Sequence, residues 1–143
     1  MSSTTTRPVP AQDRRSTPRS ALYSSLIGLA ALGVLLQAVW AGLFIHERQD
    51  NNSTFVEVHA RGAEITLALA AVATVVALVR LRGRRELVVG SVVFTVLLVL
   101  ESFVGGLIGA HSALQVLHFP LAMALMGLAV WLPLRARHQR DPR

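Results

Sequence analysis

Four long apolar runs, separated by short polar segments, dominate this chain of 143 residues. The runs cover residues 22–45, 56–79, 87–110 and 113–134. Each is long enough, or nearly so, to cross the roughly 30 Å hydrocarbon core of a bilayer as a helix, which takes about 20 residues. The pattern predicts an all-α integral membrane protein, folded as a four-helix bundle whose helices run up, down, up and down.

The second apolar run is the least regular of the four. Only residues 65–79 are uninterrupted, and charged or polar side chains crowd its first two turns: Glu57, His59, Arg61 and Glu64. An ionisable side chain inside a membrane is costly. We therefore expect the entrance of this helix to lie at the membrane interface or to face protein.

Two parts of the chain share one pattern. In residues 36–43 and in residues 100–107, a polar residue is followed five positions later by glycine and six positions later by leucine. The polar residue is Gln37 in the first copy and Glu101 in the second. Each copy leads to a histidine near the start of the next run, at His59 or His118. The pattern predicts a tandem pair of αα-hairpins, each with one imidazole and one amide or carboxyl group at matching depth.

Composition agrees with the membrane prediction. Apolar residues make up 52% of the chain and the mean hydropathy is +0.51, which would leave a soluble domain little polar surface. Cysteine is absent, which excludes disulfides, thiolate metal sites, iron–sulfur clusters and cysteine nucleophiles. No nucleophile elbow, phosphate-binding glycine loop or zincin motif is present. The sequence thus gives no support for hydrolase activity or for nucleotide-driven activity.

The basic residues are all arginine, a usage typical of GC-rich, actinobacterial-type genomes, and they raise the isoelectric point to about 11.6. A nucleic-acid partner is not expected, because the arginines flank apolar runs and no separate domain carries a basic face. They precede the first run, separate the second from the third and follow the fourth: Arg7, Arg14, Arg15, Arg19, Arg80, Arg82, Arg84, Arg85, Arg135, Arg137, Arg140 and Arg143. Only Arg48 and Arg61 lie near the opposite ends of the apolar runs, around the connection between the first run and the second.

Segments rich in arginine stay in the cytoplasm. The sequence therefore predicts a multi-pass protein of the bacterial inner (plasma) membrane with both termini cytoplasmic. Residues 1–20 are expected to form a disordered cytoplasmic tail, because they are rich in Ser, Thr, Pro and Arg. Residues 21–135 are the predicted membrane domain, and residues 136–143 are a basic cytoplasmic tail.

Four polar residues are predicted to occupy one level in the outer third of the bundle, one from each helix: Gln37, His59, Glu101 and His118. The two histidines lie on diagonal helices, roughly 13 Å apart at ordinary helix spacing. Two imidazoles close such a gap only through a group between them, and a haem iron with two axial imidazoles fits it. The sequence therefore predicts a haem b site with His59 and His118 as the iron ligands.

The other candidate site residues have supporting roles. Gln37 and Glu101 would fix the ligand imidazoles in one tautomer, or would act only as polar contacts between helices. Arg61 would neutralise the haem propionates, or would extend to water and lipid phosphate at the interface.

A family resemblance points the same way. Residues 57–61, Glu-Val-His-Ala-Arg, resemble the entry of the second helix in haem A synthase, a family whose four-helix halves carry paired histidines on their second and fourth helices. His118 follows His59 at a spacing similar to that family's. This chain differs in having one four-helix unit and in the Ala60 between His59 and Arg61. Residues 37–42 and 117–120 also resemble a family of small, functionally uncharacterised four-span bacterial membrane proteins.

Two other functions remain open at this point. The chain can be a cofactor-free accessory subunit whose polar layer only specifies helix pairing, with the bilayer and a membrane protein as its partners. It can also be a small transporter that uses Glu101 as a proton site. Four spans per chain would then require a homodimer.

Overall fold

The computed structural model describes residues 18–46 and 52–138. Within them the chain forms the helices α1 (Pro18–His46), α2 (Asn52–Arg80), α3 (Arg85–Leu107) and α4 (Gln115–His138), with one short 3₁₀ helix, η1 (Ser112–Leu114). The described ranges contain no strand. The predicted all-α class is thus confirmed.

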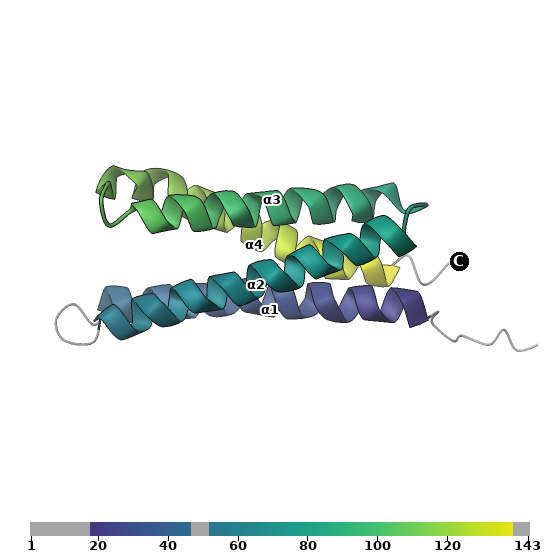
Figure 1. The fold of residues 1–143 in the computed structure, drawn as a ribbon, viewed down its shortest axis with the longest axis horizontal. Helices are drawn as coiled ribbons and strands as arrows, with labels where there is room; N and C mark the ends of the chain where they lie inside the picture. Colours follow the sequence, from purple (N-terminus) through teal and green to yellow (C-terminus); the bar gives the residue numbers. More distant parts are fainter. Residues whose placement is uncertain (1–17, 47–51, 139–143) are drawn as a thin grey trace, which may run out of the picture.

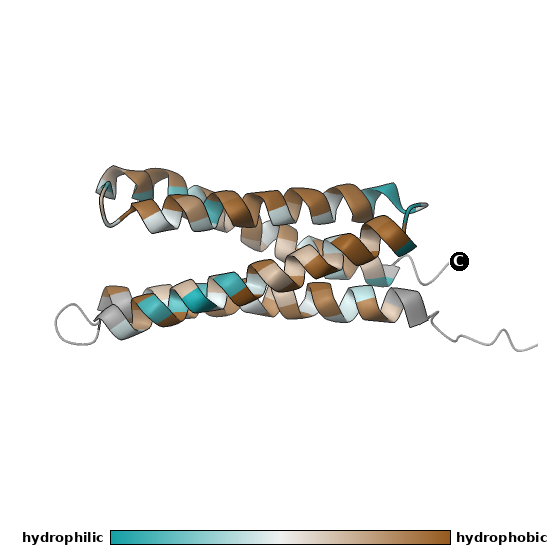
Figure 2. Ribbon diagram, viewed as in Figure 1, coloured by the Kyte–Doolittle hydropathy of each residue, from teal (hydrophilic) through white to brown (hydrophobic). Residues whose placement is uncertain are grey.

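All four helices are long and apolar enough to cross a membrane. By length and hydropathy the candidate spans are Ala21–Leu43, Thr54–Arg80, Arg85–Leu107 and Ser112–Arg137. Figure 2 shows apolar residues along most of each helix. Large apolar side chains such as Ile65, Val89 and Phe103 are more than half exposed, as expected where lipid replaces water around a bundle.

The third span ends earlier than its predicted end at residue 110. α3 stops at Leu107, and the N–H groups of Ala110 and His111 both bond to the Leu107 carbonyl, at 3.1 and 2.9 Å. Glycine lowers helix stability, and Gly105, Gly106 and Gly109 surround this end. α4 begins at Gln115, so Pro120 lies inside the helix and not at its start.

The helices are arranged as a ring. α1 packs on α2, α2 on α3, α3 on α4 and α4 on α1, whereas the diagonal pairs make no close backbone approach within the described residues. Figure 1 shows the connection 81–84 at one end of the bundle, together with the start of α1 and the end of α4. The connection 108–114 lies at the opposite end. Diagonal helices therefore meet only through their side chains.

Small residues fill much of the helix interfaces. Six alanines are almost completely buried: Ala30, Ala70, Ala73, Ala77, Ala129 and Ala136. Large side chains are buried between them, among them Tyr23, Ile27, Leu87, Phe94 and Leu132. Association of helices in lipid depends on close packing and on hydrogen bonds between helices. The alanines allow that close approach.

A buried hydroxyl network ties three of the helices together. Tyr23 Oη on α1 lies 2.8 Å from Ser91 Oγ on α3, and Ser91 Oγ donates to the Leu87 carbonyl at 2.7 Å. Thr74 Oγ1 on α2 donates to the Ser91 carbonyl at 3.0 Å and lies 2.8 Å from Thr95 Oγ1. The network links the diagonal helices α1 and α3 inside the bundle.

The α1–α2 interface depends on a glycine. A Cβ placed on Gly33 would overlap the hydroxyl of Thr66 and would lie 3.1 Å from its Cγ2. Thr66 is buried, and its hydroxyl donates to the Gly62 carbonyl at 2.7 Å. A β-branched side chain has few rotamers available, so Thr66 cannot move aside easily.

We expect Gly33→Ala to destabilise the bundle by about 1–3 kcal/mol, because the new methyl group overpacks the α1–α2 contact. The measurement is reversible unfolding in mixed micelles, followed by circular dichroism. Gly28→Ala is the control, since a Cβ at Gly28 on the same helix meets nothing within 4 Å. Equal losses of stability in the two variants would contradict this account.

Candidate functional site

Four partly buried polar side chains, one from each helix, form the candidate site. This polar layer consists of Gln37 on α1, His59 on α2, Glu101 on α3 and His118 on α4. It lies toward the end of the bundle that carries the connection 108–114. The structure thus brings together four of the five predicted site residues.

The α3–α4 half of the layer is a carboxyl–imidazole contact. His118 Nδ1 lies 3.0 Å from Glu101 Oε1, and only 18% and 13% of the two side chains are exposed. The angles of approach are not those of a hydrogen bond, and Glu101 Oε2 and His118 Nδ1 have no hydrogen-bond partner among the described residues. Such buried groups are costly to leave unsatisfied. This pair therefore retains unused hydrogen-bonding capacity.

Gly105 gives the His118 ring its place against α3. Gly105 follows Glu101 by one helical turn, so both lie on the same face of the helix. A Cβ at Gly105 would lie 3.0 Å from His118 Cε1 and 3.5 Å from Nδ1. His118 can thus lie close to the α3 backbone while it contacts Glu101.

The α1–α2 half has a different chemistry. His59 Nδ1 lies 3.2 Å from the backbone carbonyl oxygen of Gln37. With the Gln37 amide oriented so that donors face acceptors, its Nε2 donates to the His59 carbonyl at 2.7 Å and to His59 Nδ1 at 3.0 Å, and its Oε1 accepts from Ala63 N–H at 3.2 Å. That carbonyl and that N–H are separated by one turn of α2. Gln37 therefore docks on the backbone of the helix that carries His59.

Gly62 makes this docking possible. A Cβ at Gly62 would overlap the end of the Gln37 amide. Each half of the polar layer thus uses one glycine, Gly62 or Gly105, to admit a polar side chain from the neighbouring helix. The sequence pattern alone indicated no such role for these glycines. The spacing of one helical turn between Glu101 and Gly105 is the sequence signal that could have indicated the role of Gly105.

The two histidines lie on diagonal helices. His59 on α2 and His118 on α4 are both partly buried. α2 and α4 make no close backbone approach in the described ranges. Any contact between the two imidazoles would therefore pass through the interior of the bundle.

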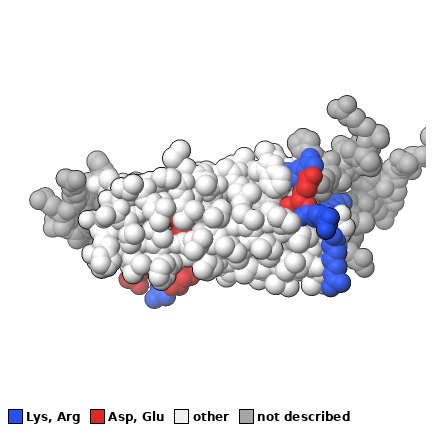
Figure 3. All heavy atoms as spheres, turned by 90° about the horizontal axis from the view of Figure 1, so that it is seen from above, with Lys and Arg blue, Asp and Glu red and all other residues white. Residues whose placement is uncertain are grey.

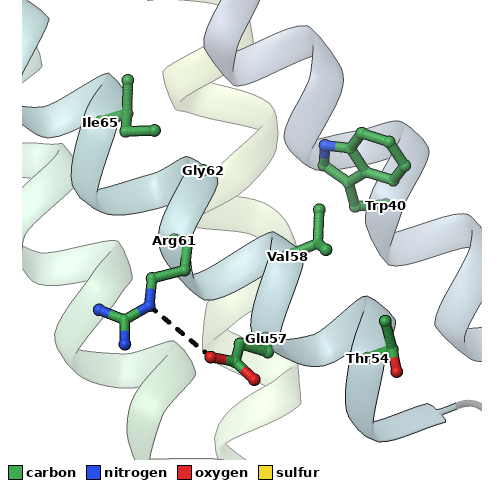
Figure 4. A pocket seen from close by; sticks show the side chains of 7 residues that line it. All are labelled: Trp40, Thr54, Glu57, Val58, Arg61, Gly62 and Ile65. Atoms are coloured by element: carbon green, nitrogen blue, oxygen red, sulfur yellow. Dashed lines mark ion pairs between the residues drawn. The ribbon is translucent and has the colours of Figure 1, made fainter.

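Arg61 lies apart from the polar layer. Its side chain is 66% exposed and pairs with Glu64 at 3.1 Å and with Glu57 at 3.8 Å, both on α2. Figure 4 shows it beside an open groove of about 430 Å³ on the outside of α1 and α2. The groove is lined by Trp40, Thr54, Glu57, Val58, Arg61, Gly62 and Ile65.

The side chains in the described ranges contain no group of three or more His, Asp or Glu residues that could hold a metal ion. His111 is exposed in the connection before α4. The side chains of His46 and His138 lie outside the described set. Among the histidines whose side chains the structure describes, His59 and His118 are the two that are partly buried.

Comparisons of the chain with protein-family models, with curated proteins and with solved structures find no significant match. The resemblance to haem A synthase therefore rests only on the motif residues given above.

We expect Gly105→Ala to displace the His118 ring, because the new methyl group would lie 3.0 Å from Cε1. The displacement is measured as a change in the imidazole NMR signals of His118 in detergent micelles. Gly106→Ala is the matched control, since a Cβ there meets nothing within 4 Å. Unchanged His118 signals in Gly105→Ala would show that this glycine does not position the ring.

Proposed function

We propose that this multi-pass protein of the plasma membrane binds haem b through His59 and His118 and acts in electron transfer or haem handling. One observation carries the proposal. Two imidazoles on diagonal helices face the same interior, and the Nδ1 atom of each lies against an oxygen of a neighbouring helix, the Gln37 carbonyl or the Glu101 carboxyl.

This arrangement suits histidines that bind a metal. A ligating imidazole commonly has one ring nitrogen held by a carbonyl or a carboxylate, which fixes its orientation, while the other nitrogen binds the metal. The Gln37 carbonyl lies in position to hold the His59 ring in this way. The Glu101 carboxyl lies 3.0 Å from the His118 ring and would take the same role once the two groups align as a hydrogen bond. Haem iron takes four ligands from the porphyrin and needs only two from the protein, so a cluster of three protein ligands is not required.

The donor set supports the proposal, since two imidazoles are a ligand pair that haem iron accepts. At ordinary helix spacing, diagonal helices lie roughly 13 Å apart, a separation that two imidazoles with a metal between them would span. Gly105 allows one ligand ring to lie close to α3, and Glu101 Oε2 is a buried acceptor with no partner among the described residues. Arg61 faces away from the polar layer and has no part in the proposal.

When bound, haem b would supply a one-electron redox centre. His59 and His118 would supply the two ligands that the iron takes from the protein. Glu101 would place a carboxyl group next to one ligand, where it influences the reduction potential. The protein's own contribution is therefore to hold two imidazoles, to exclude water from them and to set the local charge.

A second function is favoured by the docking of Gln37 on α2. An amide that bonds to the backbone of a neighbouring helix is also a device for helix pairing, since hydrogen bonds between helices stabilise membrane bundles. A cofactor-free accessory subunit would use the polar layer in this way alone.

The orientation in the membrane is part of the proposal. The connection 81–84 and its flanking residues carry four arginines, and the end of α4 lies at the same end of the bundle. The positive-inside rule places this end in the cytoplasm. Both termini are then cytoplasmic, the helices run up, down, up and down, and the polar layer lies near the outer surface.

The purified protein, expressed with ample haem, is expected to show the absorption spectrum of a low-spin, six-coordinate haem b. His59→Ala and His118→Ala should each abolish or convert this spectrum, because each removes an axial ligand. His111→Ala should leave it unchanged, because His111 is exposed outside the polar layer.

Absence of a Soret band from the unmodified protein would reject haem binding and would favour the accessory function. A spectrum that survives His59→Ala and His118→Ala alike would show that haem binds elsewhere. Helix content measured by circular dichroism separates loss of a ligand from loss of the fold.

The orientation can be tested with single cysteines, because the chain has no native cysteine. In intact spheroplasts, Ser112→Cys should react with a membrane-impermeant maleimide, whereas Gly83→Cys should react only after lysis. Both positions are exposed in connections. The reverse labelling pattern would place the polar layer near the cytoplasm.

A further inference from the structure

The end of the bundle opposite the polar layer concentrates positive charge. We call five residues the arginine end: Arg80, Arg82, Arg84, Arg85 and Arg137. Figure 3 shows basic side chains gathered at this end, whereas most of the rest of the visible surface is uncharged. Four of the five lie within six consecutive residues at the α2–α3 connection.

The charge of the arginine end is not neutralised within the described residues. Glu86 is the one described acidic side chain nearby, and it pairs with Arg135 at 2.5 Å. The arginine end itself makes no ion pair with a described carboxylate, and Arg82 Nε donates only to the Leu78 carbonyl, at 3.0 Å. An anion from outside the chain would therefore meet five guanidinium groups that no described carboxylate neutralises.

The connection that carries these arginines is firmly held. Leu81 is only 7% exposed and belongs to the core of the bundle. Its N–H bonds to the Ala77 carbonyl at 2.9 Å, and Arg84 N–H bonds to the Leu81 carbonyl at 2.8 Å. The backbone of the turn is thus fixed, and little conformational entropy is lost there on binding.

Exposed apolar side chains lie directly beside the arginine end. Val79 on α2 and Val89 on α3 are 59% and 61% exposed, and Leu78 and Trp131 are also exposed. All four belong to the membrane-spanning segments. A ligand that covers both surfaces must have an anionic head and apolar chains.

We propose that the arginine end binds the phosphate headgroups of anionic phospholipids, with their acyl chains along Leu78, Val79 and Val89. Guanidinium groups suit phosphate because they can donate two parallel hydrogen bonds. Free phosphate and nucleic acid match the charge but have no apolar part for the adjacent surface. The proposal is independent of haem binding, which concerns the other end of the bundle.

The test uses the full-length protein, purified in a neutral detergent and mixed with equal amounts of phosphatidylglycerol and phosphatidylcholine of the same acyl chains. Native mass spectrometry measures how much of each lipid the protein retains. We expect phosphatidylglycerol to be retained several-fold more strongly. Arg82→Gln/Arg85→Gln should remove most of this preference, because each arginine near the membrane surface adds to the attraction of anionic lipid.

Arg82→Lys/Arg85→Lys is the matched control, because it keeps the charge and should keep most of the preference. Both double variants should have the helix content of the unmodified protein, since the two side chains are exposed. If the glutamine variant cannot be produced, the unmodified protein still provides a test. Its preference should fall with added salt, because the Debye length shrinks from about 10 Å at 0.1 M to about 3 Å at 1 M.

Three results would overturn the proposal. The first is equal retention of the two lipids by the unmodified protein. The second is an undiminished preference in the glutamine variant or at high salt. The third is a rise in melting temperature on addition of inorganic phosphate, or of a short RNA, that equals the rise with phosphatidylglycerol.

Discussion

Polar side chains inside this bundle must find their partners on the protein, because hydrocarbon offers no hydrogen bonds. The hydroxyl network around Tyr23 and Ser91 meets this requirement completely, with every contact running between helices or back to a helix carbonyl. The polar layer meets it only in part, since Glu101 Oε2 has no partner among the described residues. The hydroxyl network and the polar layer thus differ in whether all of their buried polar atoms have a hydrogen-bond partner.

Glycine controls where polar groups can enter the interfaces. Gly62 admits the Gln37 amide to α2, and Gly105 admits the His118 ring to α3. A glycine inside a helix costs up to about 1 kcal/mol relative to alanine, and that cost is offset here by contacts that a methyl group would prevent. Neighbouring glycines such as Gly106 meet nothing within 4 Å of a Cβ. Glycines at consecutive positions, such as Gly105 and Gly106, therefore have different roles.

The apolar runs were enough to predict four helices and the level of the polar layer, because lipid imposes length and hydropathy directly on the sequence. They did not predict the early end of α3, which follows from local glycine and turn hydrogen bonds around Leu107. Nor did they predict that Gln37 would bond to the α2 backbone. Hydropathy indicates which parts of the chain are buried. Whether a buried polar side chain bonds to another side chain or to the backbone depends on how closely the two helices approach each other.

Arg61 shows why sequence proximity misleads within a helix. It lies two residues from His59, which places the two side chains on nearly opposite faces at 100° per residue. Its ion pairs with Glu57 and Glu64 follow the spacing of four and three residues along the same outer face. α2 therefore carries an imidazole on its inner face and a charged cluster on its outer face, at the same depth along the helix. A group held by His59 would experience the charge of Arg61 only across the helix.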